Sequence, residues 1–309
     1  MLRRCLSLLI SLCLPLALGA CSYHTLTEYA VKIERARSGL ERKEIDLPGG
    51  LHYVYLEGGA GETLVLLHGL GGNKDNFTRV ARLLTPHYRV IVPDLVGFGE
   101  STRLPGADYR AGAQLERVRA LLQALGVRSS HLGGNSMGGY VALAYAARYP
   151  AEVGSLWLLD PAGIQNAPAS ELKAIMTAKG GNPLLARNEE EFARVFDFIM
   201  SDPPYLPRGM LDEMAQERIA NFATEQYVFA QIAGDSLEQA VAGLATPTLI
   251  VWGEQDRVIH VGSADVLHKL LPHSSVIVMP RIGHVPMVEQ PALTAQDYLR
   301  FRATLAAPH

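Results

Sequence analysis

The chain has 309 residues, of which 48% are hydrophobic and 19% are charged. A disordered chain would be poorer in apolar residues, and a protein with several membrane spans would contain more than one long apolar run, so both classes are excluded. The 28 basic and 31 acidic residues give a net charge of −3. No basic excess is available to bind a phosphate backbone, and we expect no nucleic-acid partner.

The cysteines are confined to the start of the chain, at Cys5, Cys13 and Cys21. The remainder therefore has no disulfide, no thiolate metal site and no cysteine nucleophile. The histidines show no pair with the spacing of metal ligands. We expect neither a metal nor another cofactor.

The first 21 residues have the pattern of an export signal. Arg3 and Arg4 precede an apolar run from Cys5 to Cys21, which is typical of a signal sequence. The residues 18–21 resemble a bacterial lipobox, in which the cysteine is lipidated and becomes the new N-terminus. An uncleaved membrane anchor is the alternative, because the run is at the short limit for a bilayer span. In both cases the arginines stay inside and the body lies outside the cytoplasmic membrane.

The next segment, 22–40, predicts an amphipathic helix beside the membrane. Between Tyr23 and Ser38, apolar residues recur at helical spacing with charged residues between them, and Gly39 is a plausible stop. The apolar stripe can pack on the body, lie on lipid, or pair with a second copy of the chain.

The body alternates short apolar runs with helical stretches, which predicts an α/β fold with a mostly parallel sheet covered by helices on both faces. The expected strands are Leu51–Leu56, Thr63–Leu67, Arg89–Val92, His131–Gly133, Ser155–Leu159, Thr248–Trp252 and Val276–Met279. The expected helices are Tyr109–Leu125 and Met137–Arg148.

One stretch interrupts this alternation. Residues 161–245 show no strand pattern, are rich in phenylalanine and methionine, and are broken by Pro203, Pro204 and Pro207. We interpret them as a helical cap over the carboxyl ends of the strands, where open α/β sheets bind ligands. The sequence thus predicts a core at 41–160 and 246–309, with the cap inserted between two late strands.

The segment Gly134-Asn-Ser-Met-Gly138 follows an expected strand and opens an expected helix. A G-x-S-x-G pattern in this context predicts a sharp turn that presents Ser136 as a nucleophile, because glycines allow the crowded backbone and the helix N-terminus favours developing negative charge. The alternative is a purely structural glycine turn.

A serine nucleophile needs a base, and the base needs an orienting carboxylate. Asp256 and His284 each follow an expected late strand, and the order Ser, Asp, His suits this fold class. The alternatives to Asp256 are Glu254, the nearest other carboxylate in the same turn, and Asp160. The rivals of His284 are His260, His268 and His273.

The oxyanion of the reaction needs two backbone N–H donors. We expect one from Met137, the residue after the nucleophile, and one from Leu70 in the glycine-rich loop that starts at His68. We expect His68 itself to brace this loop without transferring protons.

These motifs resemble the α/β-hydrolase family and, within it, a group of bacterial lipases and membrane-anchored phospholipases A. The segments that carry the resemblance are His68–Phe77, Pro93–Ser101, Gly133–Gly139, Asn182–Leu185, Pro203–Pro207 and Gly283–Glu289. The resemblance covers about residues 50–305 and implies an α/β-hydrolase fold and hydrolysis of carboxylic esters by Ser136, Asp256 and His284.

From the residues and this resemblance we expect a serine hydrolase of lipid acyl esters in the cell envelope. Its expected partners are the lipid substrate and membrane lipid, with a homodimer through the N-terminal helices as a further possibility. A carbon–carbon bond hydrolase of the same fold and a non-catalytic envelope binding protein are the alternatives.

Overall fold

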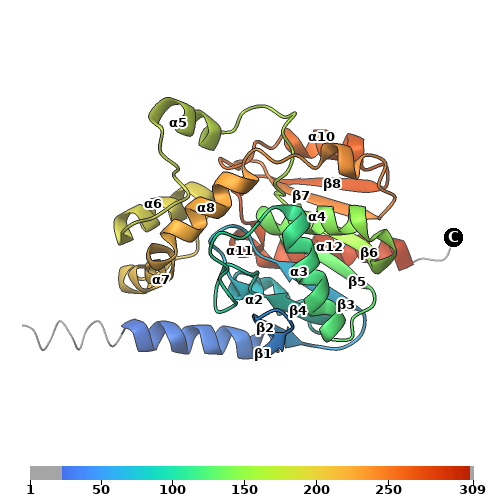
Figure 1. Ribbon diagram of the computed structural model, residues 1–309, viewed down its shortest axis with the longest axis horizontal. Helices are drawn as coiled ribbons and strands as arrows, with labels where there is room; N and C mark the ends of the chain where they lie inside the picture. The colour runs from blue at the N-terminus through green and yellow to red at the C-terminus, as the bar shows by residue number, and fades with distance from the viewer. Residues whose placement is uncertain (1–22, 307–309) are drawn as a thin grey trace, which may run out of the picture.

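The computed structural model describes residues 23–306. The signal, lipobox or anchor expected at 1–21, including Cys21, lies outside the described residues. The described chain forms one sheet with helices on both faces and a group of helices at one end (Figure 1).

The sheet has eight strands in the order β1-β2-β4-β3-β5-β6-β7-β8. Only the pairs β1–β2 and β2–β4 are antiparallel, and the other neighbours are parallel. The parallel strands are buried on both faces, which accounts for their continuous apolar sequences. The strands are β1 Glu41–Leu47, β2 Leu51–Gly58, β3 Thr63–Leu67, β4 Arg89–Pro93, β5 Ser130–Asn135, β6 Val153–Leu159, β7 Thr248–Gly253 and β8 Ser274–Met279.

All seven expected strands are present, and β1 is an additional one. Its sequence is mostly charged and its side chains are mostly exposed, so it carries little of the apolar signal that identified the others. It pairs with β2 through a hairpin in which Gly49 and Gly50 both have positive φ. The turn glycines and the partner strand define β1.

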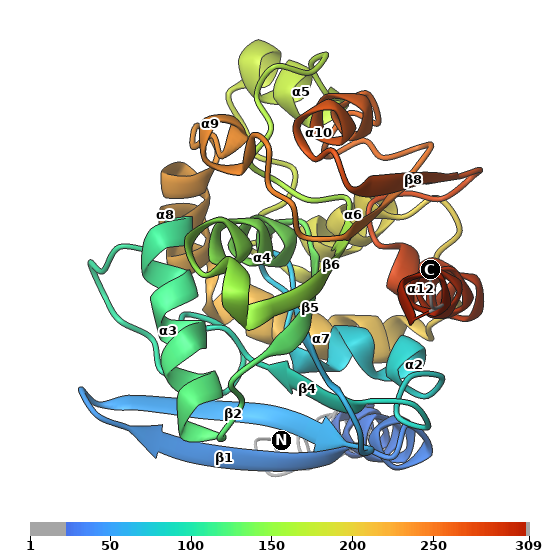
Figure 2. The same cartoon turned by 90° about the vertical axis from the view of Figure 1, so that its right-hand side faces the viewer.

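Two apolar cores lie on opposite faces of the sheet. Helices α3, α4 and α10 cover one face, and α2 and α12 cover the other (Figure 2). The helices of the core are α2 Thr78–Ala81, α3 Ala111–Ala124, α4 Met137–Arg148, α10 Ser263–Leu270, α11 Pro286–Glu289 and α12 Pro291–Ala306, with short 3-10 turns η1 Lys74–Phe77 and η2 Pro150–Glu152. The expected helix at Tyr109–Leu125 begins two residues later, at Ala111.

The segment between β6 and β7 is helical, as the sequence predicts, and its helices α6, α7 and α8 lie together at one end of the sheet in Figure 1. No strand occurs in this segment, every residue of which the structure describes. Its helices are α5 Glu171–Lys179, α6 Glu189–Ile199, α7 Arg208–Ala220, α8 Phe222–Ile232 and α9 Glu238–Val241.

A helix at 23–37 precedes the sheet and ends at a left-handed Gly39. Gly39 and Leu40 donate N–H bonds back to Ala36 and Arg35, a Schellman stop that satisfies the last carbonyls. Arg35 makes two bonds of 2.6–2.7 Å with the Asp75 carboxylate in η1. The end of this N-terminal helix is therefore held on the core.

The beginning of the N-terminal helix is more exposed and contacts the cap. His24 forms a hydrogen bond with Glu213 of α7, and the Tyr23 ring packs against Gly209. Leu26 and Tyr29 remain 49% and 63% exposed. The apolar stripe is thus only partly covered by the body: Leu40 is buried, whereas Leu26 and Tyr29 are exposed.

Candidate active site

Ser136 occupies the sharp turn between β5 and α4. Its φ of +53° and ψ of −115° lie outside the regions that non-glycine residues normally adopt, and such strain is found preferentially at functional positions. The flanking glycines permit this turn. A Cβ on Gly134 would lie 2.3 Å from the Gly138 carbonyl carbon, and one on Gly138 would lie 1.9 Å from the Leu67 oxygen. Ser136 itself is partly exposed at the end of the sheet.

This crowding predicts a large stability difference between two glycine substitutions. Gly138→Ala is expected to lower the free energy of unfolding by about 3 kcal/mol or more, because the methyl group meets rigid backbone. Gly112→Ala in α3 has open space around its Cβ and is expected to be neutral or to stabilise by about 0.5 kcal/mol. Thermal and denaturant unfolding of both variants measures the difference, and equal stability would contradict the crowded turn.

Asp256 and His284 meet at the same end of the sheet. Nδ1–H of His284 donates to Oδ2 of Asp256 at 2.8 Å, and both side chains are buried. Oδ1 of Asp256 accepts the backbone N–H groups of Val258 at 2.7 Å and Ile259 at 3.0 Å. The carboxylate is therefore oriented by its own loop, and it orients the imidazole.

The loop after β3 lies against Ser136. A Cβ on Gly69 would lie 3.3 Å from the Ser136 Cβ, so the loop that contains Leu70 borders the serine. Met137 begins α4 directly after Ser136. His68 is buried: its Nδ1–H donates to the Gly69 oxygen, and its Nε2 accepts the Leu95 N–H. Burial lowers the pKa of His68, so the ring is neutral and braces the loop.

A family model described as alpha/beta hydrolase fold matches residues 62–291. This chain belongs to the α/β-hydrolase family. The match confirms the resemblance and the fold class that the motifs predict, and it includes the three residues Ser136, Asp256 and His284.

Relatives of this hydrolase are lipases by name. It is 46% identical to Lipase 1 of Psychrobacter immobilis over 287 residues, which cover 91% of this chain and 90% of the relative. It is 45% identical to Lipase 3 of Moraxella sp. (strain TA144), with 89% of each chain covered. The crystal structure of a membrane phospholipase A, described as a bacterial virulence factor, has a TM-score of 0.91 and 39% identity and covers 100% of both chains.

Most of the residues considered as alternatives to Asp256 and His284 lie away from that pair in this hydrolase, and Asp160 is the exception. Glu254 is exposed and accepts the Arg281 N–H, and His268 forms an exposed bond with Ser274. His260 accepts the N–H of Gly262 through its Nδ1. Asp160, however, is completely buried within a few ångströms of Asp256 and His284.

Two polar residues outside the expected triad, Asn135 and Glu289, hold the loop that carries His284. The Asn135 side chain donates to the carbonyl oxygens of His284 at 2.9 Å and Leu159 at 3.1 Å, which ties the serine turn to the histidine. The Glu289 carboxylate accepts N–H bonds from Gly283, Ser201 and Asp202. Both residues stand inside recognised motifs, beside Ser136 and five residues after His284. Their position within these motifs is the sequence signal that could have identified them.

The cap is attached directly to the loop that carries Leu70. The Arg218 guanidinium of α7 packs on Gly71, where a Cβ would lie 2.3 Å from its central carbon. Arg218 also forms a buried ion pair with Glu225 of α8 at 2.8 Å. Asn73 donates to Glu217 of α7 at 3.1 Å. A shift of α7 would therefore be transmitted to the expected oxyanion loop.

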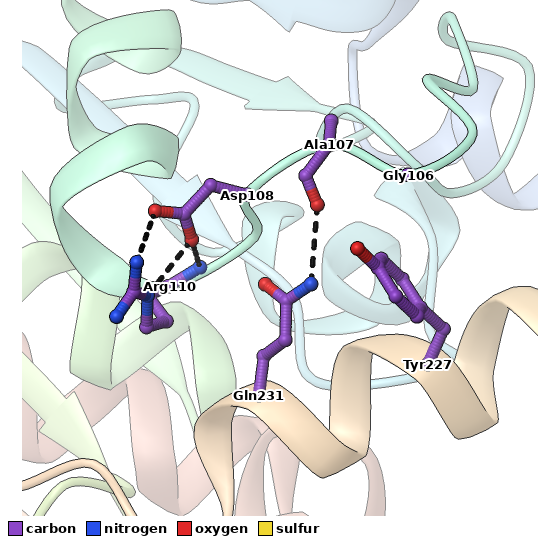
Figure 3. A pocket seen from close by; sticks show the side chains of 6 residues that line it. All are labelled: Gly106, Ala107, Asp108, Arg110, Tyr227 and Gln231. Atoms are coloured by element: carbon purple, nitrogen blue, oxygen red, sulfur yellow. Dashed lines mark hydrogen bonds and ion pairs between the residues drawn. The ribbon is translucent and has the colours of Figure 1, made fainter.

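A surface cavity of about 390 Å³ lies between the cap and the core, away from these groups (Figure 3). It is lined by Gly106, Ala107, Asp108, Arg110, Tyr227 and Gln231. Gln231 of α8 accepts the Tyr109 N–H at 2.7 Å and donates to the Ala107 oxygen at 3.1 Å. None of the three expected catalytic residues lines this cavity, which marks an attachment point of the cap.

Within residues 23–306, one group of side chains has donor spacing that would suit a cation: Asp160, Asp256 and His284, with one atom from each lying within 4.8 Å of the others. The direct His284–Asp256 bond and the backbone donors on Asp256 already account for two of these three groups. In the same range of residues, no helix is long and apolar enough to cross a membrane.

Proposed function

We propose that this chain is a serine hydrolase of lipid acyl esters that acts in the cell envelope. The family model and the lipase relatives support ester hydrolysis. The observation that carries the catalytic assignment is the buried His284–Asp256 pair, which stands with the strained Ser136 turn at one end of the sheet. Ser136, Asp256 and His284 form the triad in this proposal.

The mechanism follows from these positions. Ser136 Oγ attacks the acyl carbonyl while His284 takes its proton through Nε2, since Nδ1 is engaged with Asp256. The oxyanion is stabilised by the N–H groups of Leu70 and Met137, which are preorganised by the braced loop and the start of α4. His284 then protonates the leaving alcohol, and water releases the fatty acid from Ser136.

The lipid class of the substrate is supported by the cap and by the relatives. Small apolar clusters hold the cap together around Phe192 and Phe198, while Tyr205 is 91% and Met214 is 41% exposed. In this proposal, these exposed side chains contribute to contact with a lipid interface. We retain 161–245 as the cap and 41–160 with 246–309 as the core.

Membrane association is the remaining part of this proposal. The apolar run that ends at Cys21 comes directly before the N-terminal helix, whose Leu26 and Tyr29 are exposed. A lipidated Cys21 or an uncleaved anchor provides one membrane signal and the helix a second. The body then lies on the outer side of the cytoplasmic membrane. The same exposed stripe is the surface through which two copies would pair.

A substrate panel tests the proposed function. Purified full-length protein is incubated with p-nitrophenyl esters, triglycerides, phospholipids and a vinylogous 1,5-diketone, the substrate class of carbon–carbon hydrolases. We expect turnover of the esters. Cleavage of the diketone alone would establish the carbon–carbon hydrolase, and binding of lipid without any turnover would establish the non-catalytic binding protein.

The exposed stripe is tested by Leu26→Glu combined with Tyr29→Glu. We expect turnover of phosphatidylcholine vesicles to fall about tenfold or more, because each side chain contributes on the order of 1–2 kcal/mol when buried in lipid. Turnover of soluble p-nitrophenyl esters should be retained. Phosphatidylcholine has no net charge, so repulsion between the new glutamates and the lipid headgroups would not be a separate cause of the lower turnover.

The matched control places the same two charges on α12, as Leu293→Glu with Leu305→Glu, where the side chains are similarly exposed. This control should keep its vesicle activity. Sedimentation of the stripe variant in detergent measures whether two copies still pair, and it therefore distinguishes a loss of pairing from a loss of lipid contact. An equal loss of activity on soluble esters and on vesicles would mean that the stripe packs on the body of the protein and stabilises it instead of contacting lipid.

A further inference from the structure

Asp160 is a fully buried carboxyl that the mechanism above does not use. It follows β6, and its φ of +46° lies in the left-handed region that non-glycine residues seldom adopt. Its N–H donates to the Val251 oxygen at 3.0 Å, and its Oδ1 accepts the Gly253 N–H at 2.8 Å. Strand β7, which leads to Asp256, therefore holds Asp160 through its backbone and through its side chain.

The second carboxyl oxygen of Asp160 faces the proposed triad. Oδ2 is buried and accepts no hydrogen bond within the part of the chain that the structure describes. One oxygen of Asp160, one oxygen of Asp256 and one ring nitrogen of His284 lie within 4.8 Å of one another. If Asp160 were ionised, Oδ2 would be a buried carboxylate oxygen without a donor, beside a second carboxylate, which is costly. A protonated Asp160 instead provides an O–H donor.

The charged groups around Asp160 favour this neutral form. Asp256 faces it from the loop after β7, and Glu289 lies nearby on α11, so both acidic neighbours oppose a further negative charge. His284 is already bonded to Asp256. Burial, and next the charge of Asp256, raise the pKa of Asp160 well above its ordinary range.

We propose that Asp160 is a positioning residue that remains protonated and donates its Oδ2–H to the Asp256 carboxylate. Together with the N–H groups of Val258 and Ile259 and the His284 ring, this bond completes the donors around Asp256 and holds it toward the imidazole. The inference rests on the proposed function, because the position of Asp256 matters to catalysis only if His284 is the base of Ser136.

The protonation state is tested without any substrate. The infrared difference spectrum between the full chain and its Asp160→Asn variant at neutral pH is expected to contain the C=O band of a protonated carboxyl. A difference spectrum with carboxylate bands alone would overturn the proposal. Because this readout needs no turnover, its failure is distinguishable from a failure of the ester panel.

The positioning role is tested by two substitutions of similar size. Asp160→Leu removes the donor, and we expect kcat for p-nitrophenyl esters to fall about 10–100-fold with KM changed less than about threefold, as for loss of a hydrogen bond to a charged group. Asp160→Asn keeps an acceptor for Gly253 and a donor for Asp256, and should recover most of this loss. Similar activity of the two variants would overturn the role.

The pH profile separates a neutral Asp160 from an ionised one. Asp160→Asn replaces one neutral group by another, so the acid limb of kcat/KM should keep its midpoint. If Asp160 were ionised, removing its charge would move that midpoint down by about one unit, which would overturn the proposal. Loss of activity in EDTA with recovery in a divalent cation would also overturn it, since a cation would then occupy the place of the proton.

The Leu variant also leaves the Gly253 N–H without its acceptor, so its folding is followed by thermal unfolding. If Asp160→Leu does not fold, the infrared spectrum and the acid limb of Asp160→Asn still decide the proposal, because the Asn variant retains both hydrogen bonds.

Discussion

Ser136→Ala is expected to lower the turnover of p-nitrophenyl esters by about 10⁴–10⁶ while the fold remains intact, because loss of a triad nucleophile removes the covalent route altogether. Alanine lacks only the hydroxyl, and the turn is enforced by Gly134, Gly138 and the backbone bond from Ser136 to Leu159. The measurement is kcat/KM together with labelling by a fluorophosphonate, which should modify Ser136 in the native chain and leave the variant unmodified.

The control for this experiment is Ser275→Ala, which removes an exposed hydroxyl from β8. It should keep full activity and full labelling at Ser136. A Ser136→Ala protein that retained a tenth of the native turnover would refute the assignment of the nucleophile, provided that its thermal unfolding matched that of the native chain.

The sequence predicts the fold well where the apolar pattern is continuous. Strands β3 and β7 are uninterrupted apolar runs, and their expected and observed bounds agree within one residue. The sequence predicts strand β5 at His131–Gly133, but the strand extends from Ser130 to Asn135, because its glycines carry no apolar signal and are held by pairing with β3 and β6. Strand β1 is not predicted from the sequence for the same physical reason, because its pairing with β2 defines it and an apolar pattern does not.

The sequence also predicts which kinds of side chain form the candidate site. It does not predict the hydrogen bonds that hold the loops of the site together. The order of Ser136, Asp256 and His284 follows from the motifs and from the ends of the strands. The bond from Asn135 to the His284 oxygen joins residues 149 positions apart, and that from Gly253 to Asp160 joins residues 93 positions apart. Such contacts depend on strand register, which no local pattern contains. Asp160 could therefore be named as a rival acid without its place beside Asp256 being foreseen.

Asp256→Asn is expected to lower turnover by about 10⁴, the loss found when the same exchange is made in a serine-protease triad. The backbone N–H groups of Val258 and Ile259 donate to Oδ1, so the amide oxygen takes that place and the NH₂ group faces His284. Nδ1 must then accept a hydrogen bond, and the ring proton moves to Nε2. An imidazole protonated at Nε2 cannot take the proton of Ser136. Stopped-time hydrolysis of p-nitrophenyl esters measures the loss.

Glu254→Gln is the matched control, because it makes the same chemical change two residues away on an exposed side chain. It should keep turnover within about twofold, as is usual for a surface substitution away from the reacting groups. Asp160→Asn provides the sharper comparison, since it also replaces a buried carboxyl beside His284 but leaves the ring tautomer unchanged. If Asp160→Asn abolished turnover and Asp256→Asn did not, the carboxylate that orients His284 would belong to β6, and the triad proposed for this hydrolase would be wrong in its acid.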